Sequence, residues 1–261
     1  MVGPIAPVKR SLGRIPLMDL TEDAIFGGRV RLKQPRHGYR ANVDTILLGA
    51  AIYPPDAGKV IDLGCGVGGA LLVAAVRWPD THFVGVERDA SYAALARENA
   101  ALNVMTDRVS IHEADALAPP RDWGVFDGVF FNPPYDREGE GRPPSEVRRS
   151  AYISDAPVGD WIKIWSNRMS ADAAMTLIQR THRLPEILDA LEGRLGGVEI
   201  FPIRPAPNAS ARRIIVRARK GSRAPLRLWA GLDLHPDGAS KDKYTPETEA
   251  ILRGGAPLWF G

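Results

Sequence analysis

A glycine-rich turn between a predicted strand and a predicted helix is the first group of residues that could do chemistry. The strand covers Lys59–Leu63, the helix covers Ala70–Arg77, and Gly64, Gly66 and Gly68 lie between them. Glycine lets the backbone turn tightly and brings a ligand close to the peptide N–H groups at the start of a helix. The turn is therefore a candidate binding site for a nucleotide cofactor.

Acidic residues stand at the ends of three predicted strands. Asp62 lies in the strand before the glycine turn, Glu87 ends the strand His82–Glu87, and Asp115 follows the strand Val109–Glu113. Because ligands of parallel sheets bind at the carboxyl ends of the strands, we expect the three side chains to border one site. Glu87 can accept hydrogen bonds from both hydroxyls of a ribose, and Asp115 can accept one from an adenine amino group.

Two cofactors fit this turn. Gly64, Gly66 and Gly69 match the G-x-G-x-x-G pattern of NAD-binding proteins. Asp62, however, would repel a pyrophosphate, whereas its charge suits the cationic methionine end of S-adenosylmethionine. Asp115 also has a use in binding the adenine. The residues therefore favour S-adenosylmethionine, with NAD as the alternative.

A rigid tetrapeptide, Asn132-Pro133-Pro134-Tyr135, follows the predicted strand Val125–Phe131. Two consecutive prolines fix the backbone and prevent a helix from continuing. The Asn132 side-chain carbonyl and the Pro133 backbone carbonyl can accept both N–H bonds of one NH2 group and direct its lone pair towards an electrophilic methyl. Tyr135 offers a face on which a planar substrate can stack. We assign Asn132 and Pro133 as amine-orienting acceptors and Tyr135 as the stacking platform.

These motifs together resemble the class I S-adenosylmethionine-dependent methyltransferases over about residues 58–220. The resemblance implies a doubly wound, mostly parallel, seven-stranded α/β sheet. It also implies that Arg88, Ala116 and Asn132 border the cofactor beside the glycines and acids. The Asn-Pro-Pro-Tyr motif is shared by enzymes that methylate the adenine amine, the guanine exocyclic amine or a glutamine amide of release factors. It therefore indicates N-methylation without identifying the substrate.

The segment before the strand Lys59–Leu63 reduces the number of possible substrates. It resembles the element that precedes the cofactor domain in the bacterial valine-tRNA adenine-N6 methyltransferase family, through Gln34-Pro35, Gly38-Tyr39-Arg40, Asp44 and Leu47-Leu48. The C-terminal stretches Tyr244-Thr245-Pro246-Glu247 and Ile251-Leu252 also resemble that family. The resemblance implies methylation of the adenosine just 3′ of the anticodon in a valine tRNA. The alternatives are glutamine N5-methylation of release factors, rRNA guanine-N2 methylation and DNA adenine-N6 methylation.

Basic residues outside the cofactor site are candidate tRNA contacts. They are Arg36, His37, Arg142, Arg148, Arg149, Arg213 and Arg217. Tyr39 and Arg40 are expected to close over the cofactor, although Arg40 could instead pair with Asp44 at the start of a helix. The run 212–220 alternates with the period of a strand, so one face can pack while the other meets solvent or RNA.

Strands and helices alternate along the chain, which indicates a parallel sheet covered on both faces. Further helices are predicted at 90–103, 161–169 and 185–192, and further strands at 173–179, 198–203 and 212–218. The last two strands are expected to pair. We expect an N-terminal arm and pre-domain element over residues 1–57, packed on the core, and one methyltransferase domain over residues 58–261.

Composition excludes several classes of protein. Of 261 residues, 44% are hydrophobic and 25% are charged, an ordinary globular balance. The single cysteine, Cys65, excludes a disulfide framework and a cysteine-based zinc cage, and the five histidines have no metal-ligand spacing. No apolar run approaches the length of a membrane span. We therefore expect a cytoplasmic protein with no metal and no membrane partner.

The net charge of +3 conceals two basic flanks. Residues 1–40 carry eight Lys or Arg and three acids, and residues 200–232 carry eight Lys or Arg and no acid. Such an uneven distribution indicates that the flanks meet an anionic partner, unless the arginines only solvate the edge of the sheet.

Overall fold

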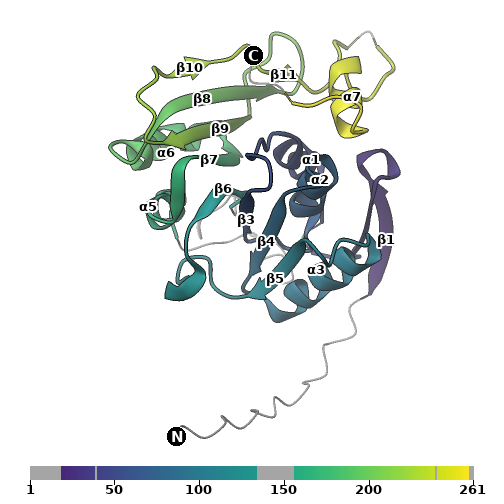
Figure 1. The fold of residues 1–261 in the computed structure, drawn as a ribbon. Helices are drawn as coiled ribbons and strands as arrows, with labels where there is room; N and C mark the ends of the chain where they lie inside the picture. The colour runs from purple at the N-terminus through teal and green to yellow at the C-terminus, as the bar shows by residue number, and fades with distance from the viewer. Residues whose placement is uncertain (1–18, 39, 134–155, 239, 259–261) are drawn as a thin grey trace, which may run out of the picture.

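The computed structural model describes residues 19–38, 40–133, 156–238 and 240–258, and a nine-stranded sheet forms its centre (Figure 1). The strands are β3 Lys59–Leu63, β4 His82–Glu87, β5 Val109–Glu113, β6 Phe126–Phe131, β7 Met169–Arg180, β8 Leu195–Arg204, β9 Arg213–Lys220, β10 Arg227–Leu228 and β11 Leu232–Asp233. Their order across the sheet is β10-β8-β9-β7-β6-β3-β4-β5, with β11 also beside β8.

Parallel pairing joins the five strands β5, β4, β3, β6 and β7. Strand β9 runs antiparallel to both of its neighbours, β7 and β8. The predicted doubly wound sheet is thus confirmed, and its seven expected strands are β3 to β9. The expectation of seven strands in total is wrong, because the two-residue strands β10 and β11 extend the β8 edge.

Two helical layers cover the sheet. Helices α1 (Val43–Ala50), α2 (Gly69–Arg77) and α3 (Ala90–Leu102) contribute to one hydrophobic core, and α5 (Val158–Ser166) and α6 (Leu184–Leu191) contribute to the other. Successive strand residues point to opposite faces, so Val60 and Phe130 join the first core while Ile61 and Phe131 join the second. Burial on both faces explains why these strands are continuous apolar runs.

An N-terminal hairpin packs beside the sheet. Its strands are β1 (Leu20–Ile25) and β2 (Val30–Pro35), joined by the short helix η1 (Phe26–Gly28). Phe26, Val30 and Leu32 are buried in the same core as α1 and α2, and the helix α7 (Pro246–Leu252) adds Ile251 to it. The hairpin and the C-terminal helix therefore share the core of the sheet, while a domain boundary at residue 57 stays a prediction.

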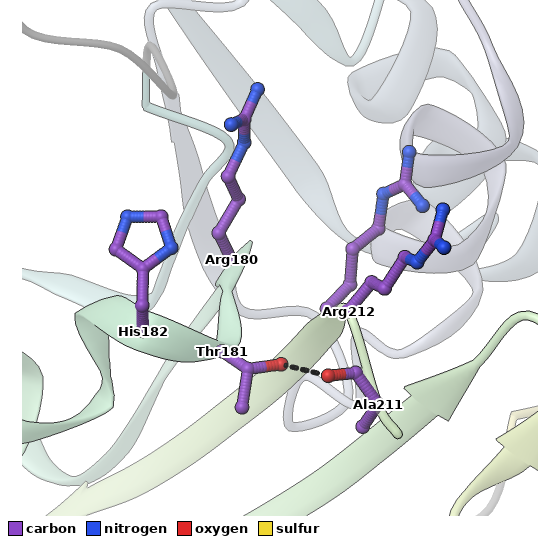
Figure 2. Close-up of a pocket in the computed structure, with 6 residues that line it drawn as sticks. Arg180, Thr181, His182, Ala211 and Arg212 are labelled. Carbon is purple, nitrogen blue, oxygen red and sulfur yellow. Dashed lines mark hydrogen bonds between the residues drawn. The ribbon is translucent and has the colours of Figure 1, made fainter. Parts of the chain in front are cut away.

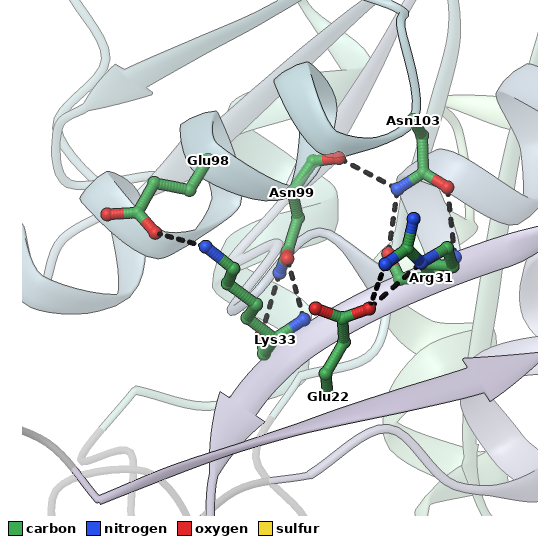
Figure 3. Close-up of polar contacts among 6 residues, drawn as sticks. All are labelled: Glu22, Arg31, Lys33, Glu98, Asn99 and Asn103. Atoms are coloured by element: carbon green, nitrogen blue, oxygen red, sulfur yellow. Dashed lines mark hydrogen bonds and ion pairs between the residues drawn. The ribbon is translucent and has the colours of Figure 1, made fainter.

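Asn99 of α3 and Asn103, which follows the end of α3, bind the backbone of β2 (Figure 3). Asn99 accepts from the Lys33 N–H at 2.7 Å and donates to the Lys33 carbonyl at 2.9 Å. Asn103 makes the same pair of bonds with Arg31, at 2.9 and 2.7 Å. The two asparagines thus satisfy peptide groups of β2 that a neighbouring strand would otherwise bind. They fix the hairpin to the helix that follows the second acidic strand.

Candidate active site

The glycine turn lies at the carboxyl end of β3, between β4 and β6. Gly64, Gly66 and Gly68 have φ values of +66°, +56° and +86°, in the left-handed region that side chains rarely adopt. The Cys65 N–H donates to the Val86 carbonyl at 2.9 Å, and the Gly68 N–H donates to the Cys65 carbonyl at 2.9 Å. These contacts hold the turn against β4 and direct the chain into α2.

Asp62 is a buried carboxylate beside this turn. Its residue is 3% exposed, and its Oδ2 atom has no hydrogen-bond partner among the described residues. Burial, and then the nearby charge of Glu87, raise the pKa of Asp62 well above its usual range. A buried anionic oxygen without a partner is costly unless a ligand supplies a donor or a positive charge.

Glu87 is the last residue of β4, and its side chain binds the backbone of the glycine turn and of the loop before α3. Its carboxylate accepts the Gly66 N–H at 3.0 Å and the Asp89 N–H at 2.9 Å. Burial raises the pKa of Glu87 although these N–H donors oppose the shift. Asp89 in turn caps α3 by accepting the N–H groups of Ser91 and Tyr92. The next predicted cofactor residue, Arg88, is exposed between them.

Asp115 and Ala116 follow β5 on the other side of Glu87. The backbones of the two strand ends are joined, because the Ala114 N–H donates to the Glu87 carbonyl at 3.0 Å. The Asp115 carboxylate accepts the Leu117 N–H at 2.8 Å, and the buried Ala116 carbonyl accepts the Trp165 indole N–H at 2.7 Å. The three acidic residues predicted to share a site therefore lie at or near the carboxyl ends of three adjacent strands.

Asn132 and Pro133 follow β6, on the opposite side of β3 from Glu87. Phe131 pairs with Leu63, so Asn132 emerges next to the start of the glycine turn. The Asn132 Oδ1 atom is buried and has no hydrogen-bond partner in the part of the chain that the structure describes. Pro133 is buried. The predicted stacking residue Tyr135 lies outside the described residues.

Trp161 is a site residue that sequence reasoning missed. Its ring stacks on Phe131 with centroids 5.8 Å apart, and a Cβ built on Gly64 would lie 3.4 Å from it. The indole nitrogen is buried and unpaired within the described ranges. In the sequence Trp161 is one apolar residue of an amphipathic helix, and no local pattern indicates that α5 brings it to the ends of β3 and β6.

The segment before α1 binds the hairpin rather than standing free. Arg40 donates to the Asp23 carboxylate at 2.7 Å, to Thr21 Oγ1 at 2.8 Å and to the Pro35 carbonyl at 2.7 Å. The expected pair of Arg40 with Asp44 is therefore wrong. Arg36 pairs with Asp19 at 2.7 Å, and His37 is exposed. Tyr39 lies outside the described residues.

Like Arg36, two further arginines expected to contact tRNA bind carboxylates of the protein itself. Arg217 pairs with Glu199 at 2.7 Å, and the Arg217 side chain is only 10% exposed. Its assignment as an RNA contact is wrong, because β9 lies inside the sheet with both faces covered. Arg213 pairs with Asp44 at 2.7 Å but keeps 37% of its side chain exposed. Arg142, Arg148 and Arg149 lie outside the described residues.

The residues present fit a cationic cofactor. Asp62 offers a buried carboxyl oxygen that has no partner among residues 19–38, 40–133, 156–238 and 240–258, and Glu87 offers a second carboxyl group one strand away. A pyrophosphate would place further negative charge beside these two carboxylates, and like charges repel. Within the described residues, no group of three or more His, Cys, Asp or Glu could hold a metal ion.

Known methyltransferases are similar to this chain in sequence. Residues 40–151 match the family described as Methyltransferase small domain. A tRNA1(Val) (adenine(37)-N6)-methyltransferase of Porphyromonas gingivalis is 27% identical over 84% of this chain and 89% of its own length. An Escherichia coli relative with the same name is 36% identical over 47% of this chain and 51% of its own.

Solved structures share the fold. A predicted O-methyltransferase from Agrobacterium tumefaciens superposes with a TM-score of 0.69 at 29% identity, covering 82% of this chain and 98% of that one. A S-adenosylmethionine-dependent O-methyltransferase from Thermotoga maritima gives a TM-score of 0.53 at 16% identity, covering 72% and 69%. The chain therefore has the fold of these methyltransferases and is similar in sequence to methyltransferases over most of its length.

Proposed function

We propose that this enzyme transfers a methyl group from S-adenosylmethionine to the exocyclic N6 amine of an adenosine in tRNA, the adenosine next to the anticodon of a valine tRNA. The names of the relatives from Porphyromonas gingivalis and Escherichia coli support this substrate. A tRNA substrate also implies work in the cytoplasm. No helix in the described part of the chain is long and apolar enough to cross a membrane.

The observation that carries the proposal is the buried Asn132 Oδ1 after β6, which has no hydrogen-bond partner among the described residues. An acceptor in this position needs a donor, and an exocyclic NH2 group supplies two. The Pro133 carbonyl is the second acceptor of the proposed pair. Two acceptors on one amine hold both of its N–H bonds and leave the nitrogen lone pair free to point away from them.

The bound cofactor supplies an electrophilic methyl group. The protein's residues then position and polarise rather than remove a proton in advance, because an amine nitrogen can attack first and lose its proton afterwards. Asp62 and Glu87 would hold the cofactor, and Tyr135 would stack on the base. An adenosine in a loop is only partly stacked, so turning it into the site costs less than it would in a duplex.

Methyl transfer from radiolabelled S-adenosylmethionine tests the proposal. Four substrates are compared: an unmodified valine tRNA transcript, the same transcript with guanosine at the target position, a release factor, and duplex DNA. We expect label in N6-methyladenosine from the first transcript and none from the second. Label confined to the release factor, or to the DNA, would overturn the tRNA assignment.

A further inference from the structure

A basic pocket opens at the carboxyl end of β7, apart from the glycine turn (Figure 2). Its volume is about 650 Å³, and we call it the β7–β9 pocket. The described residues that line it are Arg180, Thr181, His182, Ala211, Arg212 and Arg213. None of them is acidic, and Arg180, His182 and Arg212 are exposed.

Backbone and side-chain hydrogen bonds make the walls of this pocket rigid. The Thr181 N–H donates to the Arg212 carbonyl at 3.2 Å, and Thr181 Oγ1 donates to the Ala211 carbonyl at 2.8 Å. Figure 2 shows the Arg180 and Arg212 side chains extending to the same side of the strands. Because these walls are already ordered, ligand binding loses little conformational entropy in the protein.

The charges around the pocket favour an anion. Arg180 and Arg213 are directly opposed in the β7–β9 pairing, and like charges in that position are destabilising. Asp44, which is 1% exposed in the first turn of α1, holds the Arg213 Nε at 2.7 Å and offsets one positive charge. Arg212 has no ion pair within the described residues. A phosphate would offset the positive charge of Arg212, and a planar guanidinium group can bind two of its oxygens.

The pocket lies on the same edge of the sheet as Asn132. Phe131 of β6 pairs with Leu177 of β7, and Arg180 follows three residues later. Asn132 and Arg180 are thus separated by ~7 Å along the strands and by one strand spacing of ~4.8 Å across them. This separation is comparable to the distance between successive nucleotides of a nucleic-acid backbone. One RNA strand could therefore contact both Asn132 and the β7–β9 pocket.

We propose that the β7–β9 pocket binds a backbone phosphate of the RNA next to the adenosine that is methylated. The inference rests on the proposed function and names Arg180, His182 and Arg212 as substrate-binding residues. A phosphate contact positions the RNA without reading its sequence and without touching the reacting amine. Its loss should therefore raise KM and leave kcat unchanged.

Arg212→Ala tests the inference, with Arg223→Ala as the matched control. Both arginines are exposed in the basic C-terminal flank, but Arg223 follows the far end of the antiparallel strand β9, at the opposite edge of the sheet. For Arg212→Ala we expect the KM for the valine tRNA to rise about tenfold. The slope of log K against log salt should become about 0.7 shallower. Arg223→Ala should change neither.

A second pocket variant, His182→Ala, keeps the test valid if Arg212→Ala fails to fold. The melting temperature and the affinity for S-adenosylmethionine are measured for all three variants. If wild-type enzyme methylates the tRNA while Arg212→Ala and His182→Ala keep its KM and salt slope, the pocket assignment is wrong and the proposed function stands. If Arg223→Ala weakens tRNA binding as much as Arg212→Ala does, the loss reflects the overall positive charge of the protein, and the pocket assignment is also wrong. If wild-type enzyme does not methylate tRNA at all, both proposals fall.

Discussion

Two buried polar atoms lie at the carboxyl edge of the sheet. Asp62 Oδ2 and Asn132 Oδ1 are both buried and unpaired within the described residues. A buried acceptor of this kind costs roughly 1–3 kcal/mol, and a charged one costs more. The two atoms flank the turn at Gly64, one in β3 and one after β6. A cationic cofactor would supply a positive charge to Asp62, and an amine substrate would supply a hydrogen-bond donor to Asn132.

Asp62→Asn should stabilise the cofactor-free protein and weaken cofactor binding. Burial raises the pKa of Asp62 in the folded protein above its unfolded value of about 3.9. The folded protein is therefore most stable, with respect to this group, below about pH 3.9, where the carboxyl is protonated in both states. This stability is lost as the pH rises through the raised folded pKa. The variant should therefore melt higher than wild type at pH 7.5, and the difference should shrink as pH falls. Its affinity for S-adenosylmethionine should drop by about 10- to 100-fold.

Calorimetric titrations between pH 5 and 8 check the sign. In wild type, a proton and the cationic cofactor compete for the same carboxylate, so affinity should fall as pH decreases. In Asp62→Asn it should stay low and lose that part of the pH dependence. An equal pH dependence in both proteins would contradict a direct role for the carboxylate.

Asn132→Ala should bind S-adenosylmethionine as wild type does and yet lose turnover. Removing one preorganised hydrogen-bonding group costs about 10²- to 10³-fold in kcat. Asn167→Ala is the control, since the exposed Asn167 side chain donates to the Lys163 carbonyl at 3.1 Å, at the end of α5. Isothermal titration and single-turnover methyl transfer separate the two effects. Equal loss of binding and turnover would mean that Asn132 is structural.

At the scale of elements, α3 connects the cofactor turn to the N-terminal hairpin. Asn99 is fully buried and, besides its two bonds to Lys33, donates to the Val67 carbonyl at 2.9 Å. One side chain thus joins β2, the glycine turn and α3. The hairpin therefore has a structural connection to the cofactor site through this asparagine, in addition to its packing in the core.

Asn99→Ala should lower the free energy of unfolding by about 2–4 kcal/mol, because it leaves buried peptide groups of Lys33 and Val67 without partners. Asn103→Ala, whose bonds to Arg31 are more exposed, should cost only about 1 kcal/mol. Urea denaturation measures both. A similar loss in the two variants would show that the bond to the glycine turn adds nothing.

At the scale of the whole molecule, the two basic flanks differ in kind. In the N-terminal flank, Arg31, Lys33, Arg36 and Arg40 all form ion pairs with acidic side chains. In the C-terminal flank, Arg212 and Arg213 line a pocket. Arg213 also binds a carboxylate, as do Arg204 and Arg217. Charge counted along the chain therefore overstates the surface available to an anionic partner.

Cofactor binding should stabilise the whole fold, since its proposed ligands come from four neighbouring strands. At a concentration of 100 Kd, S-adenosylmethionine should add about 2.7 kcal/mol. For a chain of this size that corresponds to a rise in melting temperature of about 5–10 °C. Differential scanning fluorimetry checks this, with NAD as the comparison ligand. A shift with NAD instead would contradict the assignment of the acidic edge to a cationic cofactor.

Much of the fold could be predicted from local pattern. The bounds of β3, β4 and β5 equal those expected, and α2 and α3 differ from expectation by one residue. These elements are recognisable because a strand buried on both faces is a short apolar run and because glycine marks the turn after it. The glycine turn and the Asn132 segment were found in the same way, since each is a contiguous motif after a strand.

Only the tertiary structure decided which charged and aromatic side chains serve the site. Asp44 and Arg213 are 169 residues apart, and Glu199 binds Arg217 because β8 and β9 are neighbours inside the sheet. The sequence by itself determined the elements and the chemical motifs, because both depend on short-range geometry. Ion-pair partners, the interior position of β9 and the place of Trp161 depend on packing between distant segments, which no local period encodes.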